Sequence, residues 1–237
     1  MEKNKVYKIL KRVGVIFAQL FLLTVVISNL ISCLSTRNFP DLLENPRTDS
    51  LRLELFKNDV SKLNLADGDT LVDIGSQSGF HDFQIFHFYP NKFFILEDVI
   101  NKYQLNLRNL YMLDKGQRKY FRDNCIRIKG TQENIPLNSG MYKTILCRKT
   151  LHEFKNPAKM INELKRIMSP DGTLIIQEVI PKIKGEIDIS CKMKHLTKGE
   201  IVNLLSQQGL SLFSSDTTTW EIRNANEANM NILKFKK

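Results

Sequence analysis

Thr70-Leu-Val-Asp-Ile-Gly-Ser-Gln-Ser-Gly79 is the stretch of this chain that decides its predicted fold. A short β-rich run, residues 71–74, leads into a loop bounded by Gly75 and Gly79, and a helical pattern follows. In α/β folds this order of strand, loop and helix places a nucleotide at the carboxyl end of a strand, where glycine lets the backbone approach the ligand. Asp73 stands near the strand end, where it can accept hydrogen bonds from the loop or meet a cationic ligand. The alternative is a plain strand-to-helix turn, since one glycine-rich turn is a weak signal.

Two acidic residues follow the next expected strand. Residues 92–96 are a nearly continuous apolar run, typical of a strand buried on both faces, and Glu97 and Asp98 come directly after it. An acid at a second strand end, about 20 residues past the glycines, is the geometry with which dinucleotide-binding and related folds hold a ribose. The carboxylate accepts hydrogen bonds from both ribose hydroxyls, each contributing roughly 1.5–3 kcal/mol. Asp98 has a second interpretation, a charge that favours the N-terminus of the next helix.

Strands and helices alternate along the rest of the chain, which indicates an α/β fold with a parallel sheet and right-handed crossovers. A turn is expected at 169–172. Further strands are expected at 125–128, 144–147, 173–176 and 229–235, with strand-like sequence at 211–214 and 217–222. Helices are expected at 51–65, 80–89, 101–113, 157–168 and 196–205.

Composition and charge place few limits on function. The 237 residues suit one sizeable domain plus an appendage, with no signature of disorder. The net charge of +10 is explained by a solvated basic surface, and without a basic stripe interleaved with aromatics nucleic acid is not the expected partner. Cys33, Cys125, Cys147 and Cys191 fit neither a zinc pattern nor a C-x-x-C redox motif, so no metal site is predicted. With Cys33 set aside, the odd number that remains argues against a complete disulfide framework.

The N-terminal segment has the pattern of an export signal. Residues 1–12 are basic, and the apolar residues 13–34 are about long enough to cross a bilayer as a helix. Positive charge before the apolar stretch predicts a cytoplasmic amino terminus with the remainder exported. Leu30-Ile31-Ser32-Cys33 resembles the bacterial lipobox, in which Cys33 would be lipidated after cleavage. An uncleaved signal anchor and a buried or surface helix are the alternatives.

Three parts of the chain are therefore expected. Residues 1–34 are a signal peptide with a lipobox or a transmembrane anchor, residues 35–49 are a linker, and residues 50–237 are the folded domain. We expect a membrane-associated protein whose domain lies on the exported, periplasmic side. The cytoplasmic face of the membrane is the alternative.

The order and spacing of the motifs resemble the class I S-adenosylmethionine-dependent methyltransferases from about Leu51 to Lys237. Val72-Asp73-Ile74-Gly75-x-x-x-Gly79 is similar to the family's first motif, whose loop wraps the methionine part of the cofactor. Glu97 matches the acid that holds the ribose hydroxyls, and residues 132–137 resemble the loop that borders the adenine. Residues 151–154 resemble the segment that faces the substrate.

The resemblance implies a three-layer Rossmann-like sandwich with a mostly parallel seven-stranded sheet and an antiparallel C-terminal strand. It also implies S-adenosylmethionine as the cofactor. Arg148, at the end of the fourth expected strand, is added to the candidates because ligands bind at the carboxyl ends of such strands. The cofactor-binding residues expected on this basis are Asp73, Gly75, Ser76, Gln77, Gly79, Glu97, Asp98, Gln132, Glu133 and Arg148.

Two positions depart from the family pattern. The family usually has Gly-x-Gly-x-Gly in the first loop, and here the middle glycine is replaced by Gln77. If this position needs a left-handed backbone, glutamine costs about 1–2 kcal/mol. Thr131 stands where an acid before the adenine loop is common, and Glu133 and Gln132 are the candidates to replace it.

Methyl transfer from a sulfonium is an in-line displacement, for which orientation can supply most of the acceleration. A base is needed only when the acceptor must lose a proton, and His152 is the candidate because its ordinary pKa lies near neutrality. A lone histidine on a loop is more often structural. His81 and Asp82, just past Gly79, are further candidates to reach the sulfonium or the substrate.

The predicted function is a membrane-associated S-adenosylmethionine-dependent methyltransferase whose acceptor, a small molecule or a protein, the sequence does not identify. Export would place the domain where S-adenosylmethionine is not expected, so a non-catalytic exported lipoprotein on a degenerate scaffold of this kind is the alternative. A nicotinamide-dependent oxidoreductase is disfavoured, because Gly75-x-x-x-Gly79 does not fit Gly-x-Gly-x-x-Gly.

Overall fold

The structure is a computed structural model that describes residues 46–100, 115–188, 191–218 and 230–237. The predicted signal segment, Cys33, most of the predicted linker and the predicted helix 101–113 lie outside the described residues. Residues Ser50–Lys237 form one compact unit by their internal contacts. No helix in the described part of the chain has the length and apolar character needed to cross a bilayer.

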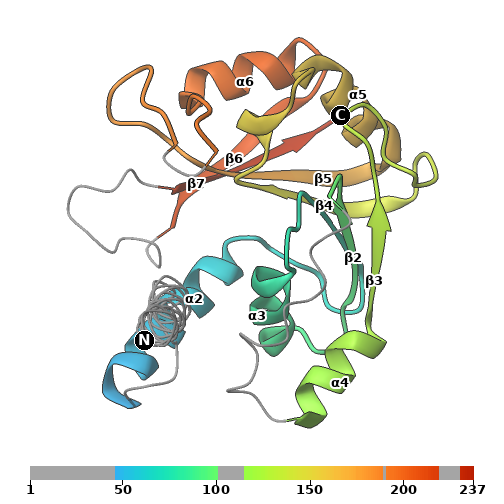
Figure 1. The fold of residues 1–237 in the computed structure, drawn as a ribbon, viewed down its shortest axis with the longest axis vertical. Helices are drawn as coiled ribbons and strands as arrows, with labels where there is room; N and C mark the ends of the chain where they lie inside the picture. The colour runs from blue at the N-terminus through green and yellow to red at the C-terminus, as the bar shows by residue number, and fades with distance from the viewer. Residues whose placement is uncertain (1–45, 101–114, 189–190, 219–229) are drawn as a thin grey trace, which may run out of the picture. The chain divides into compact units, whose positions relative to one another are not determined.

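A seven-stranded sheet organises the unit, with the strand order β3-β2-β1-β4-β5-β7-β6 (Figure 1). Every pairing is parallel except those of β7, which is antiparallel to both β5 and β6. This confirms the predicted α/β class and its reversed C-terminal strand. The strands are β1 (Thr70–Ile74), β2 (Phe93–Asp98), β3 (Cys125–Lys129), β4 (Tyr142–Arg148), β5 (Met168–Val179), β6 (Ser211–Thr217) and β7 (Met230–Lys236).

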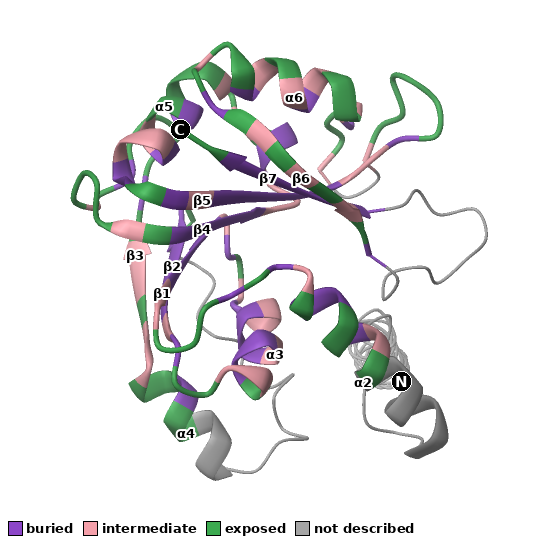
Figure 2. Cartoon of the chain, turned by 180° about the vertical axis from the view of Figure 1, so that it is seen from behind, coloured by how far each residue is buried: buried purple, intermediate pink, exposed green. Residues whose placement is uncertain are grey.

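Helices cover both faces of the sheet and complete the three layers. On one face α5 (Pro157–Ile167) and α6 (Lys198–Ser206) bury their apolar sides against β4, β5 and β7. On the other face α2 (Pro46–Ser61), α3 (Phe80–Phe88) and α4 (Lys115–Asp123) enclose a second, phenylalanine-rich core. The central strands are almost entirely buried between these layers, as Figure 2 shows. Because helices cover both faces of this sheet, the sequences of β1, β2 and β4 are largely apolar rather than alternating.

The strand order reverses between β1 and β4, which are hydrogen-bonded neighbours. The connections from β1 and from β4 leave the carboxyl edge toward opposite faces, so a crevice opens at that edge. The loop after β1 and the 3₁₀ turn η3 (Leu151–Glu153) after β4 both lie at this point. The topology therefore determines where a ligand site can form.

Several element boundaries differ from the sequence prediction. The first helix begins at Pro46, inside the predicted linker, because proline is well placed in a first helical turn. Glu97 and Asp98 belong to β2 rather than following it. The predicted turn at 169–172 is a bulge within β5, since Met168 pairs with Tyr142 but Thr173 pairs with Thr144. β6 is one strand over 211–217, and α4 was not predicted.

Candidate functional site

The glycine loop after β1 folds back over the end of β2. The backbone N–H groups of Gly75 and Ser76 both donate to the carbonyl oxygen of Glu97, each at 3.0 Å. Gly75 has a φ of 73°, and a Cβ there would lie 2.3 Å from Oγ1 of Thr150. Only glycine fits this position, because it has neither the steric penalty at positive φ nor the side-chain atom. Gly79, also at positive φ, precedes α3.

Gln77, which stands where the family usually has a glycine, has a left-handed backbone with a φ of 47°. Its N–H donates to Oδ2 of Asp98 at 2.9 Å, and its carbonyl oxygen accepts a hydrogen bond from Nη2 of Arg127. The other oxygen of Asp98 accepts from the N–H of Ile100 at 2.8 Å. Asp98 therefore holds the loop, and hydrogen bonds to its charged carboxylate can offset the backbone strain at Gln77.

Glu97 is the most unusual acidic residue of the loop region. The residue is 1% exposed, and among the described residues its Oε1 has no hydrogen-bond partner. Burial, followed by the charge of Asp98, raises the pKa of Glu97 to about 7. A Cβ on Gly130 would lie only 1.7 Å from Oε1, so a glycine at the end of β3 is needed to make room for this carboxylate.

A cleft with a volume of about 240 Å³ opens beside Glu97. Five of the predicted cofactor residues line it: Gly75, Gln77, Glu97, Asp98 and Gln132. Thr131, Thr150, Glu153, Phe154 and Met160 contribute to the remaining wall. The combination of a few polar groups with apolar walls is typical of a small-molecule site.

The other predicted cofactor residues lie elsewhere. Glu133 is more than half exposed and forms an ion pair of 2.7 Å with Lys159. Ser76, though buried, donates its hydroxyl to the backbone oxygen of Glu97 at 3.2 Å. Asp73, Gly79 and Arg148 do not line the cleft either.

Asp73 and Asp82 form a buried acidic pair beneath the loop. Burial and the neighbouring charge of Asp82 raise the pKa of Asp73 well above its usual range. Burial also raises the pKa of Asp82 to about 6, although the charges of Arg148 and Arg127 oppose the shift. The pKa of His81 is lowered by burial and then by Arg148. Asp82 is completely buried, so its predicted contact with a ligand is not what this structure shows.

His152, the predicted base, lies on η3 and is mostly buried. Its Nδ1 is 2.9 Å from Oε2 of Glu178, whose Oε1 accepts the N–H of Leu151 at 2.8 Å. Burial alone would lower the pKa of His152, but Glu178, with further contributions from Glu153 and Asp188, raises it. His152 does not line the cleft.

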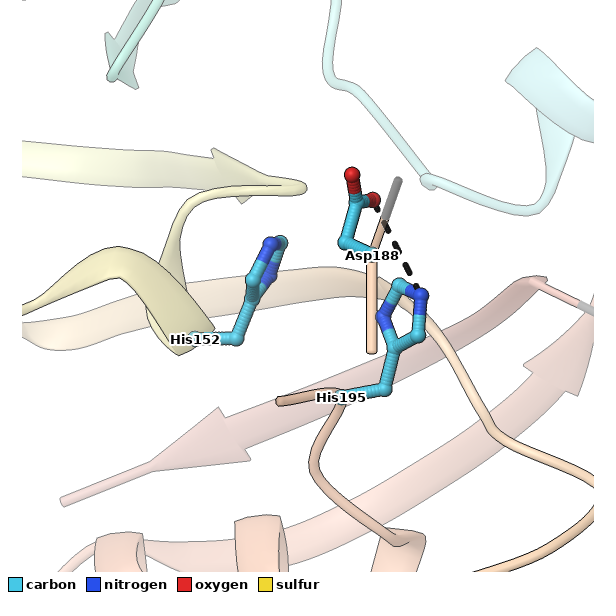
Figure 3. A group of neighbouring side chains, drawn as sticks. All are labelled: His152, Asp188 and His195. Carbon is cyan, nitrogen blue, oxygen red and sulfur yellow. Dashed lines mark ion pairs between the residues drawn. The ribbon is translucent and has the colours of Figure 1, made fainter. Parts of the chain in front are cut away.

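A second group of titratable residues, which no sequence motif predicted, surrounds His152. Sγ of Cys191 lies 3.4 Å from Nε2 of His152, and Nε2 of His195 lies 3.8 Å from Oδ2 of Asp188 (Figure 3). These residues come from two segments that are separated by β5 and α5. Within this group only Glu178 had a sequence feature that could have indicated a site, because it is an acid near the carboxyl end of a predicted strand.

Residues 65–226 match a protein family described as a methyltransferase domain. Two curated relatives are the tRNA U34 carboxymethyltransferases of Campylobacter curvus and Campylobacter concisus, which are 25% and 24% identical to this chain. The matches cover 55% and 67% of this chain, and 41% and 53% of the relatives. The chain thus spans about half the length of these relatives.

Solved structures of methyltransferases share the fold. A SAM-dependent methyltransferase from Aquifex aeolicus has a TM-score of 0.60 and 19% identity, covering 82% of this chain and 95% of its own. The 1,6-didemethyltoxoflavin-N1-methyltransferase of Burkholderia thailandensis has a TM-score of 0.59 and 12% identity, covering 90% and 88%. The family match covers more than half of the chain and agrees with the methyltransferase family that the motifs resemble.

Proposed function

Because the chain belongs to the methyltransferase-domain family, we propose that its loop cleft binds S-adenosylmethionine and that it methylates an acceptor at the carboxyl edge of the sheet. Glu97 is the observation that carries the proposal. A buried carboxylate oxygen without a hydrogen-bond partner is costly, and the ribose hydroxyls of the cofactor are donors that would satisfy it. This fit favours binding over a degenerate, non-catalytic scaffold.

The residues around the cleft have separable roles in this proposal. Glu97 would accept the ribose hydroxyls, and Gly75 would let the loop pack closely against Thr150 in the cleft wall. Asp98 would act indirectly, by fixing the backbone of Gln77. Phe154 and Met160 would exclude water on the apolar side.

The cofactor supplies an electrophilic methyl group on a sulfonium. The chain's own contribution would be to hold the acceptor in line with that group, because orientation can supply most of the acceleration. His152 would not act as the base, because its Nδ1 contacts Glu178 and the residue lies outside the cleft.

Calorimetric titration with S-adenosylmethionine tests the proposal. We expect micromolar affinity for the full chain and a loss of roughly 10-fold or more in Glu97→Ala, as hydrogen bonds to a charged group would require. Glu54→Ala is the matched control, because Glu54 is an exposed glutamate on α2. Absence of binding at millimolar cofactor would refute the proposal.

The acceptor has two candidate classes. A small molecule or protein is the first. A transfer RNA is the second, favoured by the names of the two curated relatives and compatible with the net charge of +10. Incubation of the chain with bulk tRNA and S-adenosylmethionine that carries a radiolabelled methyl group would distinguish the two classes. Label that stays in the RNA fraction after protein is removed with phenol, and that is lost when the tRNA is digested with nuclease, supports RNA as the acceptor.

Membrane association through residues 1–34 remains part of the proposal and rests on the sequence pattern alone. A carboxyl-terminal reporter that is active only in the cytoplasm would test the predicted export. Activity of that reporter would refute export and favour the cytoplasmic face.

A further inference from the structure

We propose that His152, Asp188 and His195 bind a divalent transition-metal ion of the zinc class, at a site separate from the cofactor cleft. Each residue offers one ligand atom, and the three atoms lie within 4.8 Å of one another. Ligand atoms of a tetrahedral zinc site are about 3.4 Å apart, as zinc–ligand bonds of about 2.0–2.1 Å require. Small side-chain rotations would therefore close the site around an ion. Figure 3 shows the three side chains converging.

Two of the three ligands are already oriented by neighbouring groups. The carboxylate of Glu178 accepts Nδ1–H of His152, which leaves the lone pair of Nε2 directed away from Glu178. A histidine held by a carboxylate through its second nitrogen is the usual support of a metal ligand. Oδ1 of Asp188 accepts the N–H of Cys191 at 3.2 Å, so Oδ2 is the oxygen that faces His195.

His195 supplies the independent sign of a ligand. The residue is 6% exposed, and its Nδ1 is buried with no hydrogen-bond partner in the described part of the chain. Its Nε2 lies 3.8 Å from Oδ2 of Asp188, which is too long for a hydrogen bond. Nδ1 of this ring therefore has no hydrogen-bond partner among the described residues, and the ring centroid is 5.5 Å from that of His152. A metal ion between the rings of His152 and His195 would give Nδ1 of His195 a partner, which no described residue provides.

The ligand types select the ion. Two imidazoles and one carboxylate suit zinc and its first-row neighbours, whereas magnesium and calcium prefer oxygen ligands. None of the three residues lines the cofactor cleft, although Glu153, next to His152, does. A bound ion would tie the segment after β5 to the turn after β4, beside the cleft wall.

Zinc titration of the untagged full chain, after removal of metals with a chelator, tests the site. We expect one zinc ion per chain by calorimetry, with no response to magnesium. Asp188→Asn and His195→Ala should abolish stoichiometric binding, and Glu178→Gln should weaken it by about 10–100-fold, as loss of a supporting carboxylate does. His87→Ala, which removes an exposed histidine on α3, is the matched control and should bind normally.

Fold is monitored separately by the unfolding midpoint of each metal-free variant. Zinc should raise the midpoint of the wild-type chain and of His87→Ala but not that of His195→Ala, even if His195→Ala is less stable. The proposal is overturned if zinc does not bind at micromolar concentrations, or if His195→Ala binds one equivalent as tightly as the wild type. Cofactor affinity is a different readout, so failure of this site and failure of the proposed function can be told apart.

Discussion

Replacing Glu97 with glutamine should make the cofactor-free protein more stable while weakening its affinity for S-adenosylmethionine. The ordinary pKa of a glutamate is 4.5, and burial raises the pKa of Glu97 to about 7 in the folded chain. The folded state thus resists the ionisation that the unfolded state undergoes freely. Glutamine has a similar shape but carries no charge at any pH, so it removes this penalty.

The magnitude and its sign follow from linkage. Below pH 4.5 both states keep the proton, and the stability associated with the protonated side chain is fully present. As the pH rises toward 7 the unfolded state ionises first, and this stability is lost. One pKa unit corresponds to 1.36 kcal/mol, so the loss reaches about 3 kcal/mol at pH 8 but stays below about 1 kcal/mol at pH 5.

Urea unfolding of wild-type and Glu97→Gln chains at pH 5, 6, 7 and 8, without cofactor, measures the difference. The free energy of unfolding of the variant should exceed that of the wild type by an amount that grows with pH. Glu54→Gln, at an exposed glutamate, should show no such trend. A constant difference across the series, or a variant less stable at pH 8, would refute the assignment of the raised pKa to Glu97.

Three further substitutions follow from the geometry of the loops and caps. Gln77→Gly should be neutral or stabilising by up to about 1 kcal/mol in thermal unfolding, because it relieves a left-handed backbone; a clear loss would show that the side chain itself is needed. Gly75→Ala should lower cofactor affinity at least 10-fold in calorimetry, since its Cβ would collide with Thr150, and wild-type affinity would contradict the close fit. Thr197→Ala should cost about 1 kcal/mol in urea unfolding by breaking the capping box with Glu200, and an unchanged midpoint would count against the cap.

The acidic and glycine positions near the cleft illustrate what local sequence can predict. Gly75 and Glu97 were expected at adjoining strand ends, and the structure places both at the cleft. Such a prediction succeeds because a glycine loop and a strand-end acid act through backbone geometry, which is encoded within a few residues. The left-handed conformation of Gln77 was likewise foreseeable as a possibility, though its hydrogen bond to Asp98 was not.

The sequence by itself determined the α/β class, the order of the first five strands and the loop region at which a ligand site is expected, because hydrophobic periodicity and turn chemistry are local properties. Only the tertiary structure decided which polar side chains meet. In the structure Glu133 points outward and pairs with Lys159, and Asp98 accepts a hydrogen bond from the loop backbone at Gln77. It also brought His152 to His195, across 43 residues of sequence that no local pattern connects. Contacts of this kind depend on how whole helices and strands pack against one another, so a local sequence pattern does not predict them.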